Sequence, residues 1–332
     1  MKYLKNKKVS VSILVVVLFA LVSAAGYALK NPSDVPGPSS SNEVYQGQPS
    51  VNETLTTAIT GDGPAAIGGE TGEAGVTDGA PVEEKPAVEP KPAESTVVTG
   101  NLSNTKKGWG LKRNDSHEQP EMPASISAGL SKYGAYWIGS PNEKNLYLTF
   151  DEGYENGYTP QILDTLKAND VKAAFFVTGH YLKSQPELIK RMVDEGHIVG
   201  NHTDSHPSMP GISDEEIKQE LQLVEQAYEQ VTGRTGMKYL RPPMGEYSER
   251  TLALTQELGY HNIFWSMAFV DWVPMPGGPD EAYQSVMDNL HNGALVLLHA
   301  VSKDNTESLD KILKDTKAQG YTFKNLDDLV GS

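Results

Sequence analysis

Residues 146–159 read LYLTFDEGYENGYT, so a short apolar run ends in two adjacent carboxylates, Asp151 and Glu152, followed by Gly153. Two like charges at the end of a buried strand repel each other, and burial removes the water that would stabilise each of them. The arrangement therefore predicts a compensating partner elsewhere in the chain, and it marks the end of this strand as a candidate site of chemistry.

Short apolar runs alternate with helical patterns from residue 144 to the C-terminus. The pattern at 213–233 begins with Ser213, has Glu216 three residues later and ends at Gly233, which are capping signals. Strand candidates are residues 146–150, 173–179, 197–201, 238–242, 261–266, 294–300 and 321–325. This alternation predicts a parallel α/β sheet, and both an open doubly wound sheet and a (β/α) barrel fit it. No Gly-rich phosphate fingerprint follows a strand, which disfavours a nucleotide-binding fold.

The first hundred residues differ in composition from the rest of the chain. Four lysines precede an uncharged, mostly apolar run at 9–29, so we interpret residues 1–30 as an export signal peptide or, alternatively, a membrane anchor. Residues 31–100 contain nine prolines and ten glycines, with eleven acidic residues against two lysines. Such a composition cannot bury a core, so residues 31–105 are predicted to be a disordered acidic linker.

Residues 106–332 are predicted to form one folded domain, since they hold all four tryptophans and are long enough for one core. The chain has no cysteine, so this domain needs no disulfide even if it is exported. More than half of the formal net charge of −15 lies in the linker, and no basic surface indicates nucleic-acid binding. We expect an exported monomer in the cell wall or extracellular space, with the membrane as a partner only through the N-terminal segment.

Polar residues stand at the ends of the predicted strands. In chain order they are Asp151 and Glu152, His202 and His206, Arg241, Asp271 with Trp272, and His299. In a parallel βα fold all these strand ends meet on one face, which is where active sites form.

The i, i+4 spacing of His202 and His206 would place both imidazoles on one side of a helical turn. Such a pair alone is more often a surface feature, but two strand-end carboxylates beside it favour a divalent cation such as zinc. One carboxylate would bind the cation and the other would remain an ionised base, which would explain the adjacent charges.

Arg241 is either a surface arginine on a rigid turn or the group that lowers the pKa of Asp151. Asp271 is either a helix cap or the carboxylate that orients His299 as a general acid. A cation, a carboxylate base and a histidine acid together predict metal-assisted hydrolysis, with water as the nucleophile because no Ser or Cys motif is present. Tyr154 and Asn156 are either turn residues or the lip of the cleft.

The ordered motifs TFDEG, HTDSH, RPPMG, FVDW and LVLLH resemble those of the polysaccharide deacetylase family, also called NodB-homology or carbohydrate esterase family 4. The resemblance implies an irregular (β/α) barrel of about seven strands that removes acetyl groups from glycans. It implies that Asp151 is the catalytic base with Arg241 as its partner, and that Asp271 tunes His299, the catalytic acid.

The same resemblance implies a metal held by Glu152, His202 and His206, zinc first, with cobalt or manganese as alternatives. It implies substrate contacts from Trp272 and from the RPPMG loop, where Pro243 lies and where the backbone N–H of Met244 would hold the oxyanion. Three positions depart from the family pattern: Glu152 replaces an aspartate, Ala268 replaces the first acid of a DxxDW motif, and Met244 replaces the usual tyrosine.

Further stretches, GYENGYT, WSMAFVDW and GWGLKRN, extend the resemblance over residues 107–330 to the muramic-acid, delta-lactam-forming deacetylases of spore cortex. This implies N-acetylmuramic acid in peptidoglycan as the substrate, with the freed amine closing onto the lactyl carboxylate. The alternatives are N-acetylglucosamine in peptidoglycan or chitooligosaccharides, and a non-catalytic glycan-binding module. A glycosidase using Asp151 and Glu152 is disfavoured, since adjacent residues cannot flank a sugar at the required separation.

Overall fold

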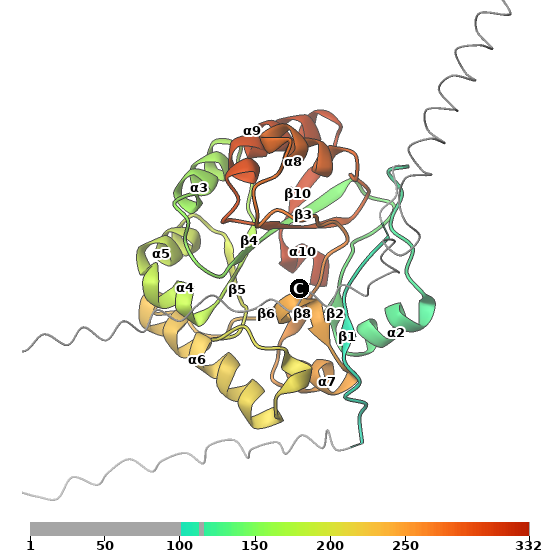
Figure 1. Ribbon diagram of the computed structural model, residues 1–332, viewed down its shortest axis with the longest axis vertical. Coiled ribbons are helices and arrows are strands. Elements are labelled where there is room, and N and C mark those ends of the chain that lie inside the picture. Colours follow the sequence, from blue (N-terminus) through green and yellow to red (C-terminus); the bar gives the residue numbers. More distant parts are fainter. Residues whose placement is uncertain (1–100, 113–115, 332) are drawn as a thin grey trace, which may run out of the picture. The chain divides into compact units, whose positions relative to one another are not determined.

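The computed structural model describes residues 101–112 and 116–331 (Figure 1). The predicted export segment, residues 1–30, lies outside the described residues, as does the predicted linker apart from residues 101–105. Among the described residues, no helix is both long enough and apolar enough to cross a bilayer. The domain boundaries proposed from the sequence stay predictions, and contacts with the folded residues begin at Ser103, whose carbonyl accepts a hydrogen bond from the Arg250 N–H.

A parallel sheet of eight strands lies at the centre of the fold (Figure 1). Its strands are β2 (Ala135–Tyr136), β3 (Asn145–Glu152), β4 (Ala174–Val177), β5 (Ile198–Asn201), β6 (Tyr239–Leu240), β8 (His261–Ile263), β9 (Ala294–His299) and β10 (Thr322–Lys324). The order is β10-β3-β4-β5-β6-β8-β2, and β9 pairs with β3. All seven strand candidates from the sequence are confirmed, and β2 was missed because two residues carry no pattern.

The sheet curls into an irregular barrel rather than lying open. β3 pairs with β4 and with β9 through the same residues, 149–151, so these two neighbours lie on opposite edges of β3. A single parallel bridge between Met267 and Val296 joins the chain after β8 to β9 and brings the ring together. The predicted barrel is confirmed, and the open doubly wound alternative is wrong.

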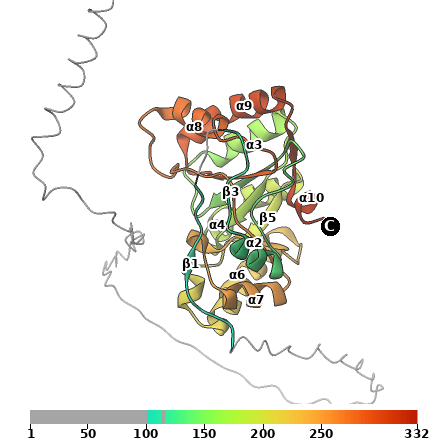
Figure 2. The same cartoon turned by 90° about the vertical axis from the view of Figure 1, so that its right-hand side faces the viewer.

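Helices surround this sheet. They are α2 (Ala124–Lys132), α3 (Thr159–Ala168), α4 (Gly179–Ser184), α5 (Pro186–Asp194), α6 (Asp214–Thr232), α7 (Glu249–Glu257), α8 (Gly278–Met287), α9 (Lys303–Ala318) and α10 (Leu326–Val330), with 3-10 turns η1 (Met209–Gly211) and η2 (Pro243–Gly245). In Figure 2, α8 and α9 lie at one end and α6 and α7 at the other, with strands between them. The predicted capping of α6 is confirmed, since Ser213 and Glu216 form a reciprocal capping box and Gly233 ends the helix at φ 70°.

The two faces of β3 pack against different layers, because successive side chains of a strand point in opposite directions. On one face, Leu148 and Phe150 join the core shared with the surrounding helices; we call this the outer face. On the other, Tyr147 packs against side chains of neighbouring strands inside the barrel; we call this the inner face. The alternation therefore places Asp151 on the inner face and Glu152 on the outer face.

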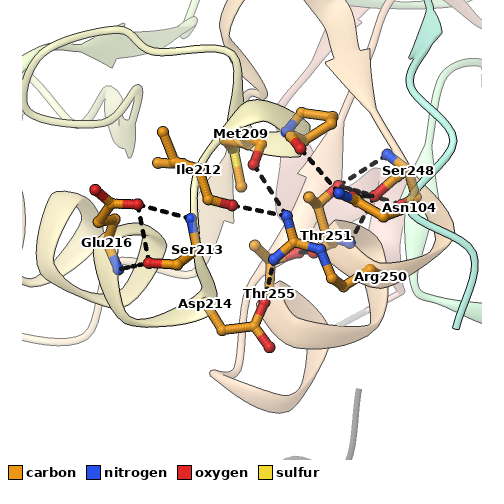
Figure 3. Close-up of polar contacts among 11 residues, drawn as sticks. Asn104, Met209, Ile212, Ser213, Asp214, Glu216, Ser248, Arg250, Thr251 and Thr255 are labelled. Atoms are coloured by element: carbon orange, nitrogen blue, oxygen red, sulfur yellow. Dashed lines mark hydrogen bonds and ion pairs between the residues drawn. The ribbon is translucent and has the colours of Figure 1, made fainter. Parts of the chain in front are cut away.

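A small antiparallel pair lies beside the barrel and was not predicted. β1 (Lys107–Gly108) pairs with β7 (Glu246–Tyr247), and each strand has only two residues. Near this pair, Arg250 at the start of α7 forms an ion pair with Asp214 at the start of α6 and donates to the Ile212 carbonyl at 2.8 Å (Figure 3). These contacts join the beginnings of two helices that follow different strands of the sheet.

Candidate active site

Arg241 and Asp151 form an ion pair at the centre of the barrel. The guanidinium, which has no exposed surface, donates from Nη1 to Asp151 Oδ1 at 2.6 Å and from Nη2 to Thr149 Oγ1 at 2.8 Å. Burial opposes ionisation of Asp151, but the positive charge of Arg241 and the neighbouring His202 and His299 hold the pKa of this carboxyl below its ordinary value. Asp151 is therefore an ionised carboxylate in a site almost without water access.

The two histidines of the HTDSH motif lie next to this carboxylate. His202 Nδ1 is 2.8 Å from the Arg241 carbonyl, which fixes the ring, and its Nε2 lies 3.6 Å from Asp151 Oδ2. The His206 ring packs edge-on against the His202 ring, with centroids 4.7 Å apart. Burial lowers the pKa of His202, and burial together with His202 lowers the pKa of His206 to about 3, so both imidazoles are neutral.

A bent loop, not a helical turn, brings these two rings together. Residues 202–208 are neither helix nor strand, and Thr203 and His206 adopt left-handed backbone conformations at φ 66° and 58°. The Thr203 side chain accepts a hydrogen bond from the His206 N–H at 3.0 Å, which stabilises the bend. The spacing predicted the proximity of the rings but not the backbone that produces it.

Glu152 points away from this group, toward the layer of helices. Its Oε1 accepts a hydrogen bond from the Thr159 hydroxyl at 3.3 Å, and its Oε2 is buried with no hydrogen-bond partner among the described residues. The Tyr181 hydroxyl, 3.1 Å from the Thr159 hydroxyl, donates to Glu155 at 2.8 Å beside it. Burial and the nearby Glu155 raise the pKa of Glu152 well above its ordinary value, so this carboxyl takes up a proton more readily than an exposed glutamate.

The histidines fit a divalent cation, whereas Glu152 does not join them. Within residues 101–112 and 116–331, no group of three or more His, Cys, Asp or Glu side chains is arranged to hold a metal ion. Two neutral imidazoles beside a carboxylate are suitable donors, but Glu152 lies on the opposite face of β3 because it follows Asp151 directly. Of the three predicted metal ligands, the structure therefore places His202 and His206 together and Glu152 apart from them.

Asp271 and His299 form a second ionisable pair near the first. Asp271 Oδ1 lies 2.6 Å from His299 Nδ1, and Oδ2 accepts from the His299 backbone N–H at 2.8 Å. Asn305, at the start of α9, also donates to Asp271, at 2.5 Å. Burial opposes protonation of His299, but the Asp271 charge outweighs it and raises the pKa of the imidazole above its ordinary value. His299 therefore stays protonated to a higher pH than an exposed histidine, with Nε2 left to donate.

The predicted substrate-binding residues differ in their exposure and in their contacts. Trp272 is half-exposed, and its ring meets His299 edge-on with centroids 5.0 Å apart. Met244 is exposed and has φ 57°, a left-handed conformation, whereas Pro243 is buried and shapes the loop from within. The loop after β3 contacts the chain just beyond β9. Tyr154 is exposed, and Asn156 donates to the Val301 carbonyl at 3.1 Å, just beyond β9.

Four supporting residues were not identified from the sequence. Thr149 accepts from Arg241 and donates to the Val296 carbonyl at 2.6 Å, and Asn305 holds Asp271. The Phe176 ring lies 4.2 Å from the Arg241 guanidinium, and Gly200 leaves room for this ring, since a Cβ there would lie 2.6 Å from it. The alternation of β3 could have identified Thr149, because it shares the inner face with Asp151.

Comparison of the sequence with known proteins finds enzymes. A family model for polysaccharide deacetylases matches residues 138–263. The peptidoglycan-N-acetylmuramic acid deacetylase PdaA of Bacillus subtilis is 48% identical over 230 residues, which cover 69% of this chain and 88% of that protein. A peptidoglycan-N-acetylglucosamine deacetylase of Bacillus cereus is 33% identical over 201 residues, covering 59% of this chain and 72% of that protein.

The fold matches a solved structure as well. The structure of Bacillus subtilis PdaA, described as a family 4 carbohydrate esterase, superposes with a TM-score of 0.66 at 47% identity. The match covers 69% of this chain and 98% of that chain. Sequence and structure thus point to the same relatives.

Proposed function

Because the chain belongs to the polysaccharide deacetylase family, we propose that it hydrolyses the N-acetyl group of N-acetylmuramic acid in peptidoglycan. The observation that carries the chemistry is the presence of two ion pairs in one site, with pKa values moved in opposite directions. Opposite shifts of this kind assign a base and an acid within one cleft. The similarity to PdaA supports muramic acid as the sugar.

Asp151 is the proposed general base. Arg241 occupies Oδ1, so Oδ2 is the oxygen available to take a proton from the attacking water. The lowered pKa keeps this carboxylate ionised across the neutral range, and the fully buried guanidinium prevents it from rotating. Water activated here would attack the amide carbon and form a tetrahedral adduct.

His299 is the proposed general acid. Its Nδ1 is engaged by Asp271, so the proton for the departing sugar nitrogen comes from Nε2. Protonation of this nitrogen makes it a leaving group, which an amide nitrogen otherwise is not. Trp272, packed against the same imidazole, offers a ring face for the sugar.

The remaining groups of the proposed site would stabilise the negative charge that develops on the acetyl oxygen. The backbone N–H of Met244 is proposed to donate to the developing oxyanion. His202 and His206 would hold a divalent cation, zinc first, and when bound it would polarise the acetyl carbonyl as a Lewis acid. Glu152 is not part of that set in the described structure.

We also propose the wider setting that the sequence predicted. A peptidoglycan substrate lies outside the cytoplasm, which supports export through residues 1–30, either released or anchored. The resemblance to cortex enzymes supports closure of the freed amine to a delta-lactam during sporulation, and a monomer is sufficient because one chain supplies every residue named above.

The test is acetate release from peptide-stripped peptidoglycan, after chelation and with zinc, cobalt or manganese added back, and with the products read by mass spectrometry. Loss of acetyl from muramic acid supports the proposal. Loss from glucosamine alone keeps the enzyme class and overturns the sugar. No release with any cation, together with retained binding to glycan strands, would favour a glycan-binding module.

A further inference from the structure

Residues 103–109, here called the leader segment, lie before the part of the chain that matches the family model and still pack on the domain. Within it, β1 pairs with β7, and the Trp109 N–H donates to the Gly245 carbonyl at 2.9 Å. Gly245 directly follows Met244, whose N–H the proposed reaction uses. The leader segment is thus bonded to the loop that carries a proposed catalytic donor.

Trp109 fixes this loop by packing as well as by hydrogen bonding. Its indole Nε1 donates to the Trp265 carbonyl at 2.9 Å, and its ring lies 4.7 Å from that of Phe264. Gly245 is enclosed between the two tryptophans, since a Cβ built on it would lie 2.7 Å from the Trp265 ring and 2.9 Å from the Cβ of Trp109. The Trp109 ring therefore holds its own Cβ and backbone against Gly245, through its contacts with Phe264 and with the Trp265 carbonyl.

Met244 needs such support because its own conformation is strained. A non-glycine residue at φ 57° costs on the order of 1–3 kcal/mol and persists only where its surroundings impose it. Its exposed side chain contributes little of that support. Pro242 and Pro243 restrict the chain before Met244, and the contacts of Gly245 with Trp109 restrict it afterwards.

The leader segment also reaches the loop that carries His206. Asn104 donates to the Pro210 carbonyl at 2.9 Å and accepts from the Ser248 hydroxyl at 2.9 Å (Figure 3). Lys106 pairs with Glu246 at 2.8 Å, and the other oxygen of Glu246 accepts a hydrogen bond from Ser208. Two loops of the site are therefore linked through this one segment.

We propose that the leader segment is a positioning element of the active site, which holds the Pro243–Gly245 turn so that the Met244 N–H is set for the oxyanion. This inference rests on the proposed deacetylase function. It extends the functional unit of the chain beyond residues 138–263 and makes Trp109 a positioning residue.

The test uses Trp109→Ala in the full chain, with Trp109→Phe as the conservative variant. We expect kcat for acetate release to fall about 10- to 100-fold in Trp109→Ala, with KM changed less than about twofold, because only the transition state uses the oxyanion donor. Trp109→Phe keeps an aromatic ring against Phe264 and loses only the indole hydrogen bond to Trp265, so it should restore most of kcat. Tyr283→Ala, on the distant helix α8, is the control for a comparable loss of packing and should leave kcat unchanged.

Amide hydrogen exchange gives a readout that does not depend on activity. The Gly245 N–H donates to the Pro242 carbonyl at 3.0 Å, so we expect it to exchange at least about tenfold faster in Trp109→Ala than in the wild type. If Trp109→Ala does not fold, Asn104→Ala carries the same two measurements. Unchanged exchange and unchanged kcat would overturn the inference, whereas a wild type without acetate release would overturn the proposed function instead.

Discussion

The inner and outer faces of β3 place neighbouring carboxyl groups in opposite electrostatic environments. On the inner face, Asp151 meets a guanidinium at 2.6 Å and two imidazoles, and its pKa lies below the ordinary range. On the outer face, Glu152 meets a hydroxyl at 3.3 Å and another acid, and its pKa lies well above it. Position on the pleat, rather than residue type or motif membership, therefore decides which carboxyl is available for chemistry.

The largest expected effect comes from removing the charge on the inner face. Asp151→Asn keeps the shape but cannot accept a proton, so we expect acetate release to fall about 10⁴-fold. It also leaves Arg241 buried without a counter-ion, which should lower the free energy of unfolding by roughly 3 kcal/mol. Steady-state kinetics and denaturant unfolding measure both, and residual activity within tenfold of wild type would exclude Asp151 as the base.

The second-largest expected effect tests His299 as the proposed general acid. Asp271→Asn removes the charge that raises the pKa of His299, so kcat should fall about 10²-fold and the alkaline limb of the pH–rate profile should move to lower pH. In the wild type, the stabilisation from this pair is complete below the ordinary histidine pKa of 6.5 and is lost as pH rises through the raised pKa. An alkaline limb that stays in place would assign the acid to another group.

A smaller effect compares the two faces directly through metal affinity. His206→Ala should weaken zinc binding by at least about tenfold, whereas Glu152→Gln, on the outer face, should change it by less than about threefold. Isothermal titration calorimetry, on protein from which a chelator has removed bound metal, measures the zinc dissociation constant of each variant. Equal losses in the two variants would mean that the end of β3 turns inward when a cation binds, and the separation of the faces would not hold for the loaded protein.

The smallest effect is a stability difference that depends on pH. Since the pKa of Glu152 in the folded state lies above its ordinary value of 4.5, wild-type stability should fall as pH rises from that value toward the raised pKa. Glu152→Gln imitates the protonated acid and lacks this dependence. It should therefore be the more stable protein at pH 7 and lose its advantage near pH 4, as measured by thermal unfolding.

Much of the fold could be predicted because the strands carry their own pattern. The apolar runs at 146–150 and 294–300 are short and bounded by polar residues, which is typical of buried parallel strands. The polar residues at their ends indicated the face on which the site lies. Strands β1, β7 and β2 could not be predicted, since each has only two residues without periodicity and depends on tertiary contacts.

The sequence indicated which side chains of the candidate site lie together, and indicated less of their geometry. Arg241, Asp151, His299 and Asp271 meet as their motifs suggest. Glu152 illustrates the limit, because its adjacency to Asp151 suggested a shared site while the alternation of LYLTFDE places it on the other face. The left-handed turns at Thr203 and His206 have no sequence signal, as neither residue is a glycine.

Gly200 limits which substitutions the site can tolerate. It faces the Phe176 ring on which the Arg241 guanidinium rests, and even one methyl group at this position would overlap that ring. Alanine at position 200 would therefore displace the arginine and, through it, Asp151, the proposed base. The proposed reaction therefore depends on the absence of a side chain at position 200, and we expect Gly200→Ala to lose catalysis before it loses the fold.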